Sequence, residues 1–510
     1  MFNKPTIDYV AVAPILIVLG AALVGVLIEA FVERSKRYLS HLITALVGLV
    51  AAFAWIIKIH ATKLVTAEGS VTIDGPTLVI QASVVLLGIL GILLIAERSL
   101  DSAGGAFVAQ ASALPGSEAE KAAIAAKLTQ TEVFPLTLFA IVGMMLFPAS
   151  NDLVTMFVAL EVLSLPLYLM SGLARRRRLL SQESALKYFL LGAFSSAFFL
   201  YGAAFLYGYS SSVSFDRIRV AIQSNAGNDM ILLIGIAFVS VGLLFKVSAV
   251  PFHSWTPDVY QGAPTPITGF MAAATKVAAF GAALRIFYVS FAGANWNWRP
   301  IITAVAIVTM VFGSIVAIAQ RDVKRLLAYS SIAHAGFLLT GILALNRSGL
   351  EASLFYLATY GFTTLGAFAI VTLVRDSGGE VTDLNRWVGL ARRSPVIASL
   401  FAFFLLSFAG IPLTAGFVGK LTIFNAAYES ANIAVVVVGV LSSAIAAFFY
   451  IRVIVMMFFA DPIEDPVAVT IPSMNTRIVI AVSALVTLAM GVYPTPVFDA
   501  ISSLATFIHG

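Results

Sequence analysis

The chain carries fourteen apolar stretches, each long enough to cross a lipid bilayer as a helix. The hydrocarbon core of a bilayer is about 30 Å thick, which requires about 20 apolar residues in helical form. Charged residues make up only 11% of the sequence, whereas soluble proteins carry about 25%. We therefore expect an all-α polytopic membrane protein with about 14 transmembrane helices. The stretches lie near residues 9–30, 39–60, 76–96, 132–149, 152–173, 183–208, 230–261, 264–290, 300–319, 325–345, 352–374, 395–428, 432–459 and 477–499.

Basic residues in the connecting loops predict the orientation of the chain. The loops after the first, third, fifth, ninth and eleventh stretches are rich in Lys and Arg, as in "RRRR" at 175–178 and "RDVKR" at 321–325. Because basic loops stay on the cytoplasmic side, we expect both termini on the non-cytoplasmic side of a bacterial plasma membrane. The same rule explains "RRRR" as a topology anchor, with a patch for lipid headgroups or nucleic acid as the alternative. The net charge of +5 is spread over short loops, which does not indicate a nucleic-acid partner.

The sequence lacks the usual motifs for redox or nucleotide cofactors. It contains no cysteine, so it provides no thiolate ligands for an iron–sulfur cluster or a structural zinc ion. Neither a G-x-G-x-x-G motif after a strand nor a P-loop is present. We therefore expect no metal or cofactor in this chain, and no redox active site of its own.

Several ionisable residues lie inside the predicted spans, where a charge costs roughly 2.5–3.5 kcal/mol on insertion scales. Lys187 is close to the start of its span and one turn after Glu183, so a surface ion pair is the alternative to a buried role. Arg285 is near a helix end and is expected to extend toward the interface, and His41, His60 and His509 are expected at the surface. The candidates for function are Glu161, Lys187, Lys246, Lys276, His334 and Lys420.

Two of the apolar stretches are too long for one straight span and are interrupted near their middle. "SAVPFHSWTP" interrupts 230–261 just after Lys246, and "FAGIPLTAG" interrupts 395–428 just before Lys420. The second comes five spans after the first, so the two cross the membrane in opposite directions. Proline removes a backbone donor, and lipid tolerates such a gap only where it lines a polar cavity walled by protein. Paired broken helices mark the ion site of inverted-repeat transporters.

The breaks and loops predict how the chain is divided. The linker is rich in Ala, Ser and Gly, and we assign it no chemistry. We expect three leading helices in 1–100, a cytoplasmic linker in 101–130, a first five-helix repeat in 131–290, a second, inverted repeat in 300–459, and a loop with the final helix in 460–510.

A lysine beside such a gap can carry a proton. Desolvation favours the neutral amine, whereas a nearby carboxylate favours the charged form. Movement of Glu161 relative to Lys246 would therefore switch the lysine between holding and releasing a proton. A fixed ion pair that locks helices together is the alternative for any single lysine. Several ionisable groups along several helices favour a proton relay.

Four long motifs resemble one family. They are "ESALKYFLLGAFSSAFFLYG" at 183–202, "LLFKVSAVPFHSWTPDVYQGAPTP" at 243–266, "KRLLAYSSIAHAGF" at 324–337 and "LSFAGIPLTAGFVGKLTIF" at 406–424. Together they are similar to the antiporter-like membrane subunits of respiratory complex I, and most closely to subunit N, the counterpart of mitochondrial subunit 2. The resemblance extends from about residue 75 to the end of the chain.

The resemblance implies a role for each candidate residue. Glu161 matches the fifth-helix glutamate that is paired with the lysine of the broken seventh helix, here Lys246. Lys276 matches the central lysine of the eighth helix, His334 the tenth-helix histidine and Lys420 the exit-side residue of the broken twelfth helix. Lys187 matches a sixth-helix lysine typical of subunit N.

The resemblance also implies a function and partners. The chain would be a proton-translocating subunit of NADH:quinone oxidoreductase, with NADH, FMN, iron–sulfur clusters and quinone bound by partner subunits. The expected partners are the antiporter-like subunit M, the small subunits K, J and A, and lipids. One alternative is a subunit of a multi-subunit cation/proton antiporter or a membrane-bound hydrogenase. Another is a non-conducting scaffold.

Overall fold

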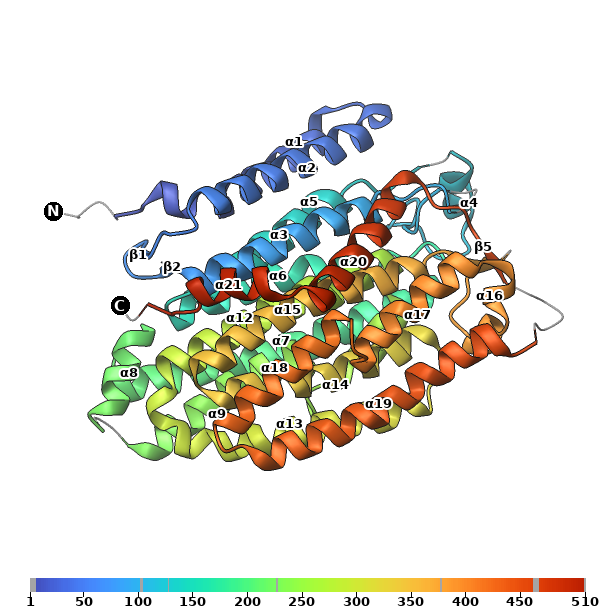
Figure 1. The fold of residues 1–510 in the computed structure, drawn as a ribbon. Coiled ribbons are helices and arrows are strands. Elements are labelled where there is room, and N and C mark those ends of the chain that lie inside the picture. The colour runs from blue at the N-terminus through green and yellow to red at the C-terminus, as the bar shows by residue number, and fades with distance from the viewer. Residues whose placement is uncertain are drawn as a thin grey trace.

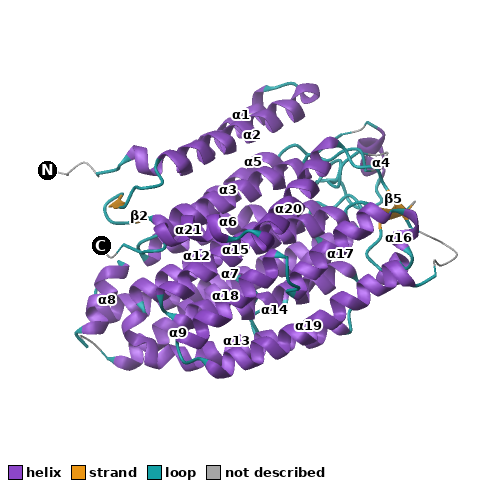
Figure 2. Cartoon of the chain, viewed as in Figure 1, coloured by secondary structure: helices purple, strands orange, loops and turns teal. Residues whose placement is uncertain are grey.

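The computed structural model describes residues 6–100, 104–126, 128–225, 228–376, 378–461 and 467–508. His509 and parts of the 101–130 linker lie outside these ranges. Long helices run side by side through the molecule, and short strands occur only in loops at the helix ends (Figure 1, Figure 2). The start of α1 and the end of α21 lie at the same end of the bundle (Figure 1), as an even number of crossings requires.

The helices of the described residues have the following bounds. In the first half they are α1 (Tyr9–Phe31), α2 (Arg34–Lys58), α3 (Gly75–Ile95), α4 (Glu118–Ala125), α5 (Val133–Leu146), η1 (Phe147–Ala149), α6 (Leu153–Ser171), α7 (Arg178–Ser210), α8 (Phe215–Gln223), α9 (Asp229–Lys246), α10 (Trp255–Gly262), α11 (Thr265–Phe270), η2 (Met271–Thr275), α12 (Lys276–Arg285) and η3 (Ile286–Ser290). In the second half they are η4 (Ala292–Ala294), α13 (Asn295–Ile318), α14 (Val323–Ala344), α15 (Arg347–Val371), η5 (Leu384–Trp387), α16 (Leu390–Arg393), α17 (Pro395–Ala409), α18 (Ala415–Glu429), α19 (Ile433–Phe459), α20 (Met474–Val492) and α21 (Thr495–Leu504).

The strands form two small sheets in loops. β1 (Leu64–Thr66) pairs antiparallel with β2 (Val71–Ile73), with Val65 opposite Thr72. β3 (Val374–Asp376) lies between β4 (Gly379–Glu380) and β5 (Ala468–Val469), and both pairings are antiparallel.

The predicted spans are confirmed. Twelve helices of the described residues are long and apolar enough to cross a membrane, and two shorter apolar helices begin at Val133 and Pro395. Their positions follow the fourteen apolar stretches of the sequence. The chain is therefore an all-α, multi-pass membrane protein.

Both predicted helix breaks are present. α9 ends at Lys246 and α10 begins at Trp255, while α17 ends at Ala409 and α18 begins at Ala415. The first broken helix packs on α7 and the second on α15, which occupies the equivalent place in the second repeat. The packing of α5 on α6 likewise corresponds to that of α13 on α14. The exact boundaries predicted for the two repeats stay a prediction.

The centre of the bundle consists of three helical segments that are buried along almost their whole length. They are the helix from Thr265 to Ser290, with π-helical turns at η2 and η3, and the helices α14 and α15. By contrast, α1, α2, α7, α13 and α19 expose many apolar side chains, as lipid-facing helices do. The central position of α12 and α14 places Lys276 and His334 away from the lipid.

A buried carboxylate joins the start of the last long helix to the end of α3. Glu97 accepts hydrogen bonds from the Ser473 and Thr476 hydroxyls at 2.5 and 2.6 Å, and from the Ser99 backbone N–H at 2.8 Å. Burial raises the pKa of the Glu97 carboxyl, but these hydrogen bonds outweigh it and lower the pKa to about 2. Glu97 therefore stays ionised, and it holds the start of α20 against the end of α3.

Two expectations about charged residues are wrong. Arg285, expected to extend toward the interface, is 0% exposed, and its Nη2 lies 2.7 Å from Oδ1 of Asp74. His41, expected at the surface, is 1% exposed, and its Nε2 lies 2.9 Å from Oε1 of Glu29. In both cases the carboxylate lies at the end of a different helix from the cation. The sequence around Arg285 or His41 therefore does not indicate the ion-pair partner.

Candidate functional site

Lys246 lies at the first helix break and is almost completely buried. It is the last residue of α9 and is 3% exposed. Its Nζ donates to the Ser164 hydroxyl on α6 at 2.8 Å and to the Tyr188 hydroxyl on α7 at 3.1 Å. The ring of Tyr188 also faces the ammonium group, with 5.2 Å from Nζ to the ring centroid. Two neutral hydroxyls and a ring therefore hold this cation.

Glu161 lies close to Lys246 without touching it. It precedes Ser164 by one helical turn on α6, and its charge attracts that of Lys246. Within the described ranges no ion pair of 4 Å or less joins the two, and Oε1 of Glu161 is buried without a hydrogen-bond partner. The structure thus brings the predicted pair onto neighbouring helices but leaves a gap between the carboxylate and the ammonium group.

Lys276 occupies the centre of the bundle. It begins α12 directly after the π-helical turn η2 and is 3% exposed. Its Nζ donates to the Ser331 hydroxyl on α14 at 2.6 Å and also to the Ser331 carbonyl oxygen. Tyr360 of α15 donates to the same hydroxyl at 2.9 Å. Ser331 is thus the shared partner of a lysine and a tyrosine from two other helices.

His334 follows Ser331 by one turn of α14 and continues the polar line. Its Nδ1 lies 2.6 Å from the Tyr356 hydroxyl, and its Nε2 lies 3.4 Å from the Tyr450 hydroxyl. The ring of Tyr360 is 5.2 Å from the imidazole ring. Both Lys276 and Lys420 act electrostatically on this histidine. His334 therefore lies between Lys276 and Lys420 in the polar series and is close enough to both for their charges to act on it.

Lys420 is held by the second helix break. Its Nζ donates to the carbonyl oxygens of Phe408 and Ala409 at 2.8 and 3.2 Å, and to the Ser443 hydroxyl at 2.8 Å. These carbonyls belong to the last turn of α17, where the break leaves them without helical donors. The negative end of the α17 dipole also favours a cation there.

Lys187 lies apart from these residues. Its side chain is 42% exposed and bridges Glu183 and Asp258, at 2.7 and 2.8 Å. Asp258 also accepts a hydrogen bond from Arg325 at 2.7 Å. The structure therefore favours the surface ion pair that the sequence left open, and the relay role of Lys187 stays a prediction.

The aromatic and hydroxyl partners of the lysines are what sequence reasoning missed. Tyr188 stacks on Trp255, the first residue of α10, with ring centroids 4.5 Å apart. Ser330 and Ser331 precede His334 in the motif "AYSSIAHAGF", and their one-turn spacing was the available signal. No sequence spacing indicates Tyr188 or Ser443, because each lies on a different helix from the lysine that it binds.

The described residues contain no group of three or more His, Asp or Glu side chains arranged to hold a metal ion. The buried site consists instead of isolated cations with hydroxyl, carbonyl and ring partners. Such groups can bind and release protons, since lysine and histidine are titratable.

The comparisons with known proteins agree on one family. Residues 150–446 match the family model described as NADH:quinone oxidoreductase/Mrp antiporter, TM. NADH-quinone oxidoreductase subunit N of Rhodococcus opacus (strain B4) is 58% identical over 99% of this chain and 97% of its own length. Subunit N of Mycobacteroides abscessus is 56% identical over 99% of this chain and 98% of its own length.

Solved structures share the fold. A chain in the structure of respiratory complex I from Thermus thermophilus with bound aureothin is 31% identical, with a TM-score of 0.77 over 96% of this chain and 99% of that one. A chain of the Mrp complex from Dietzia sp. DQ12-45-1b has a TM-score of 0.81 over 98% of this chain and 97% of that one at 20% identity, which is a likeness of fold alone. The sequence motifs, the two broken helices and the full-length relatives together show that the chain belongs to the family of NADH-quinone oxidoreductase subunit N.

Proposed function

We propose that this subunit, as a proton-translocating part of the membrane arm of NADH:quinone oxidoreductase, moves protons along the buried series Glu161, Lys246, Lys276, His334 and Lys420. The observation that carries the proposal concerns Lys246, Lys276 and Lys420, at the two helix breaks and in the centre of the bundle. Each is at least 95% buried and has only neutral hydrogen-bond partners among the described residues. A buried cation without a bound carboxylate is expensive. Such a group is therefore poised to lose its proton when the local charge changes.

Electrostatic coupling supplies the order of events. A positive charge on Lys276 disfavours a second one on His334, and a charge on Lys420 does the same from the other side. Delivery of a proton to one member of the series would therefore favour release from the next. Glu161 acts at the first break, where approach of its carboxylate would stabilise the charged form of Lys246 and withdrawal would favour release.

The hydrogen bonds of the described relay side chains form four separate groups. Lys246 bonds Ser164 and Tyr188, and Lys276 bonds Ser331, which also accepts from Tyr360. His334 contacts Tyr356 and Tyr450, and Lys420 bonds Ser443. Transfer of a proton between Lys246 and Lys276 therefore requires either water or side-chain movement.

The energy would come from partner subunits. We assign NADH, FMN, iron–sulfur clusters and quinone to other chains of the complex, and we place subunit M and the small subunits K, J and A among the neighbours in the membrane arm. The basic loops support a bacterial plasma membrane location with both termini on the non-cytoplasmic side.

The antiporter and hydrogenase alternatives are less well supported, because the Mrp chain shares the fold at only 20% identity while the relatives named subunit N exceed 50%. The scaffold alternative needs a direct test. It predicts that removal of a buried lysine charge leaves proton translocation unchanged.

The decisive experiment is the Lys246→Met variant in native membranes, with assembly of the complex checked. Methionine keeps the length of the side chain and removes its charge. We expect assembly to persist while NADH-driven electron transfer and the proton gradient fall together. Lys58→Met, which changes an exposed lysine at the end of α2, is the matched control and should leave both rates near the wild-type level. Wild-type rates in Lys246→Met would overturn the relay at this residue and support the scaffold.

A further inference from the structure

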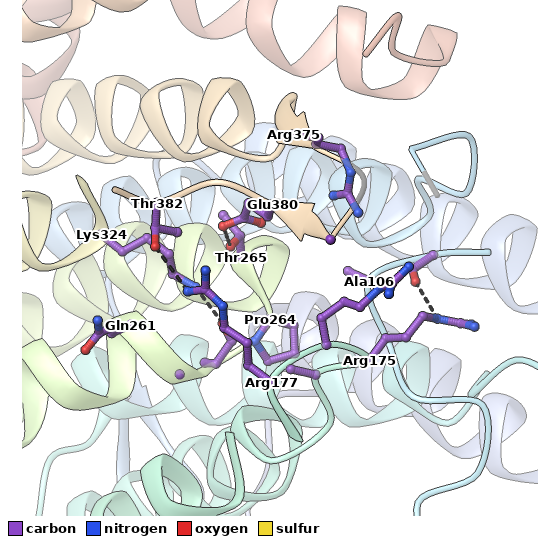
Figure 3. Close-up of a pocket in the computed structure, with 16 residues that line it drawn as sticks. Ala106, Arg175, Arg177, Gln261, Pro264, Thr265, Lys324, Arg375, Glu380 and Thr382 are labelled. Atoms are coloured by element: carbon purple, nitrogen blue, oxygen red, sulfur yellow. Dashed lines mark hydrogen bonds between the residues drawn. The ribbon is translucent and has the colours of Figure 1, made fainter. Parts of the chain in front are cut away.

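A cavity at the loop end of the bundle is surrounded by basic side chains that the proton relay does not use. Its walls come from five separate parts of the chain: residues 105–106 of the linker, the loop between α6 and α7, the corner between α10 and α11, the start of α14, and the β3–β4 hairpin with the residues that follow it (Figure 3). Five cations and one carboxylate line it among the described residues: Arg175, Arg176, Arg177, Lys324, Arg375 and Glu380.

Hydrogen bonds between the walls fix the cavity in place. Arg177 donates from Nη1 to the Thr382 hydroxyl at 3.2 Å, and Thr265 donates to Oε1 of Glu380 at 2.6 Å. Lys324 donates to the carbonyl oxygen of Ala263 at 2.7 Å. Each of these contacts joins residues more than 60 positions apart in the sequence. The basic side chains are therefore held around the cavity before any ligand binds.

Lys324 is the side chain that most needs an anion. It is 3% exposed and lines the cavity, yet its only hydrogen-bond partner among the described residues is a neutral carbonyl. Arg177 repels it, while Glu380 and Asp322 attract it without forming an ion pair with it. A buried ammonium group without a bound counter-ion is costly. An anion in the cavity would remove that cost.

The requirement for basic loops on one side of the membrane does not explain this arrangement. That rule asks only for positive charge near the helix ends, not for its convergence on one cavity. The four arginines at 175–178 also separate, because Arg178 turns away and binds Glu120 at 2.8 Å and the Ala113 carbonyl at 2.7 Å. The remaining three line the cavity together with Lys324 and Arg375.

We propose that this cavity binds a phosphate group, carried either by the headgroup of an anionic phospholipid or by free phosphate. Arginine presents a planar fork that matches phosphate oxygens, and lysine adds a point charge. The volume of about 80 Å³ is several times that needed by one buried water. A phosphate there would bridge the end of α10, in the first repeat, and the start of α14, which carries Ser331 and His334.

The test uses the complete complex, stripped of lipid and placed in phosphatidylcholine nanodiscs. Binding of radiolabelled inorganic phosphate is measured by equilibrium dialysis at low salt, and retention of added phosphatidylglycerol is measured by mass spectrometry. We compare the wild type with Lys324→Gln, which can still donate to Ala263, and with Arg177→Gln, which changes an exposed residue at the rim. The charge-matched control is Arg393→Gln, which changes an exposed residue that does not line the cavity.

We expect wild type and control to bind one more phosphate, or to retain one more phosphatidylglycerol, than the two cavity variants. If the cavity variants still bind that probe, we expect wild type and control to bind it at least tenfold more tightly. A difference in the phosphate measurement identifies the free ion, and a difference confined to the lipid measurement identifies a headgroup. Equal binding of both probes by all four proteins overturns the proposal. That result would also follow if a carboxylate of a neighbouring subunit filled the cavity.

Discussion

Two kinds of buried cation occur in this membrane protein, and they differ in what neutralises them. Arg285 forms an ion pair with Asp74 in which both side chains are 0% exposed, and the ring of Phe507 covers the guanidinium group at 4.9 Å. Lys246, Lys276 and Lys420 are buried to nearly the same degree, but their partners in the described structure are hydroxyls, carbonyl oxygens and aromatic rings.

The difference separates a structural charge from a mobile one. A carboxylate 2.7 Å away neutralises the guanidinium group, and arginine does not deprotonate in proteins. Hydroxyls and carbonyls stabilise an ammonium group less, and they can also tolerate a neutral amine. Burial alone therefore does not indicate a proton carrier. Lys246, Lys276 and Lys420 are buried with only neutral partners at the helix breaks and in the centre of the bundle, whereas the buried Lys324 lies at the loop end of the bundle, within the electrostatic reach of Glu380 and Asp322.

The largest expected effect comes from Asp74→Asn, which tests the structural half of the comparison. Asparagine keeps the shape and can still accept from the Thr77 backbone N–H at the start of α3, but it leaves Arg285 buried without a counter-ion. Breaking a buried pair in this way costs about 3–5 kcal/mol. We expect little assembled complex, as measured by native gel electrophoresis of solubilised membranes.

Lys276→Met supplies the contrast for that experiment. It removes a charge that has no ion-pair partner among the described residues, so assembly should remain near the wild-type level. Normal assembly of Asp74→Asn, or loss of assembly in Lys276→Met, would contradict the distinction between the two kinds of cation.

The sequence predicted the architecture well, for identifiable reasons. Apolar length determines a membrane span, so all fourteen stretches correspond to helices. "SAVPFHSWTP" and "FAGIPLTAG" also place the two breaks within a few residues of those in the structure, because proline and glycine interrupt a helix locally. Both apolar length and helix-breaking residues can be recognised within a short window of the sequence.

The site was only partly predictable, because its partners come from distant helices. Lys246, Lys276 and Lys420 were identified from a charge inside an apolar span, from the two helix breaks and from the family motifs. Their actual acceptors, such as Tyr188 and Ser443, lie 58 and 23 residues away from the lysine that they bind. Arg285 was misassigned for the same reason, since Asp74 is 211 residues away. For Lys187 the sequence left a surface ion pair open, and its contacts with Glu183 and Asp258 in the structure favour that alternative.

The second prediction tests the mobile half of the comparison with Lys276→Arg. Arginine keeps the positive charge but cannot give up its proton, so we expect proton translocation to fall by about tenfold or more. Assembly should persist. The measurement is the proton gradient in inverted vesicles at matched amounts of complex. If Lys276 were a fixed structural charge, Lys276→Arg would translocate protons at a nearly normal rate. That result would mean that Lys276 is a structural cation like Arg285.

The smallest effects compare the two broken helices directly, through Tyr188→Phe and Ser443→Ala. Tyr188→Phe removes one of two hydroxyl acceptors of Lys246, and a hydrogen bond to a charged group contributes about 1.5–3 kcal/mol. Ser443→Ala removes one of three acceptors of Lys420, and the two backbone carbonyls of α17 remain.

We expect about tenfold slower translocation in Tyr188→Phe and about twofold in Ser443→Ala, as measured in the same vesicles. The reverse order would show that the backbone of the second break holds its lysine less firmly than the hydroxyls hold the first. The second break would then be the more adjustable of the two.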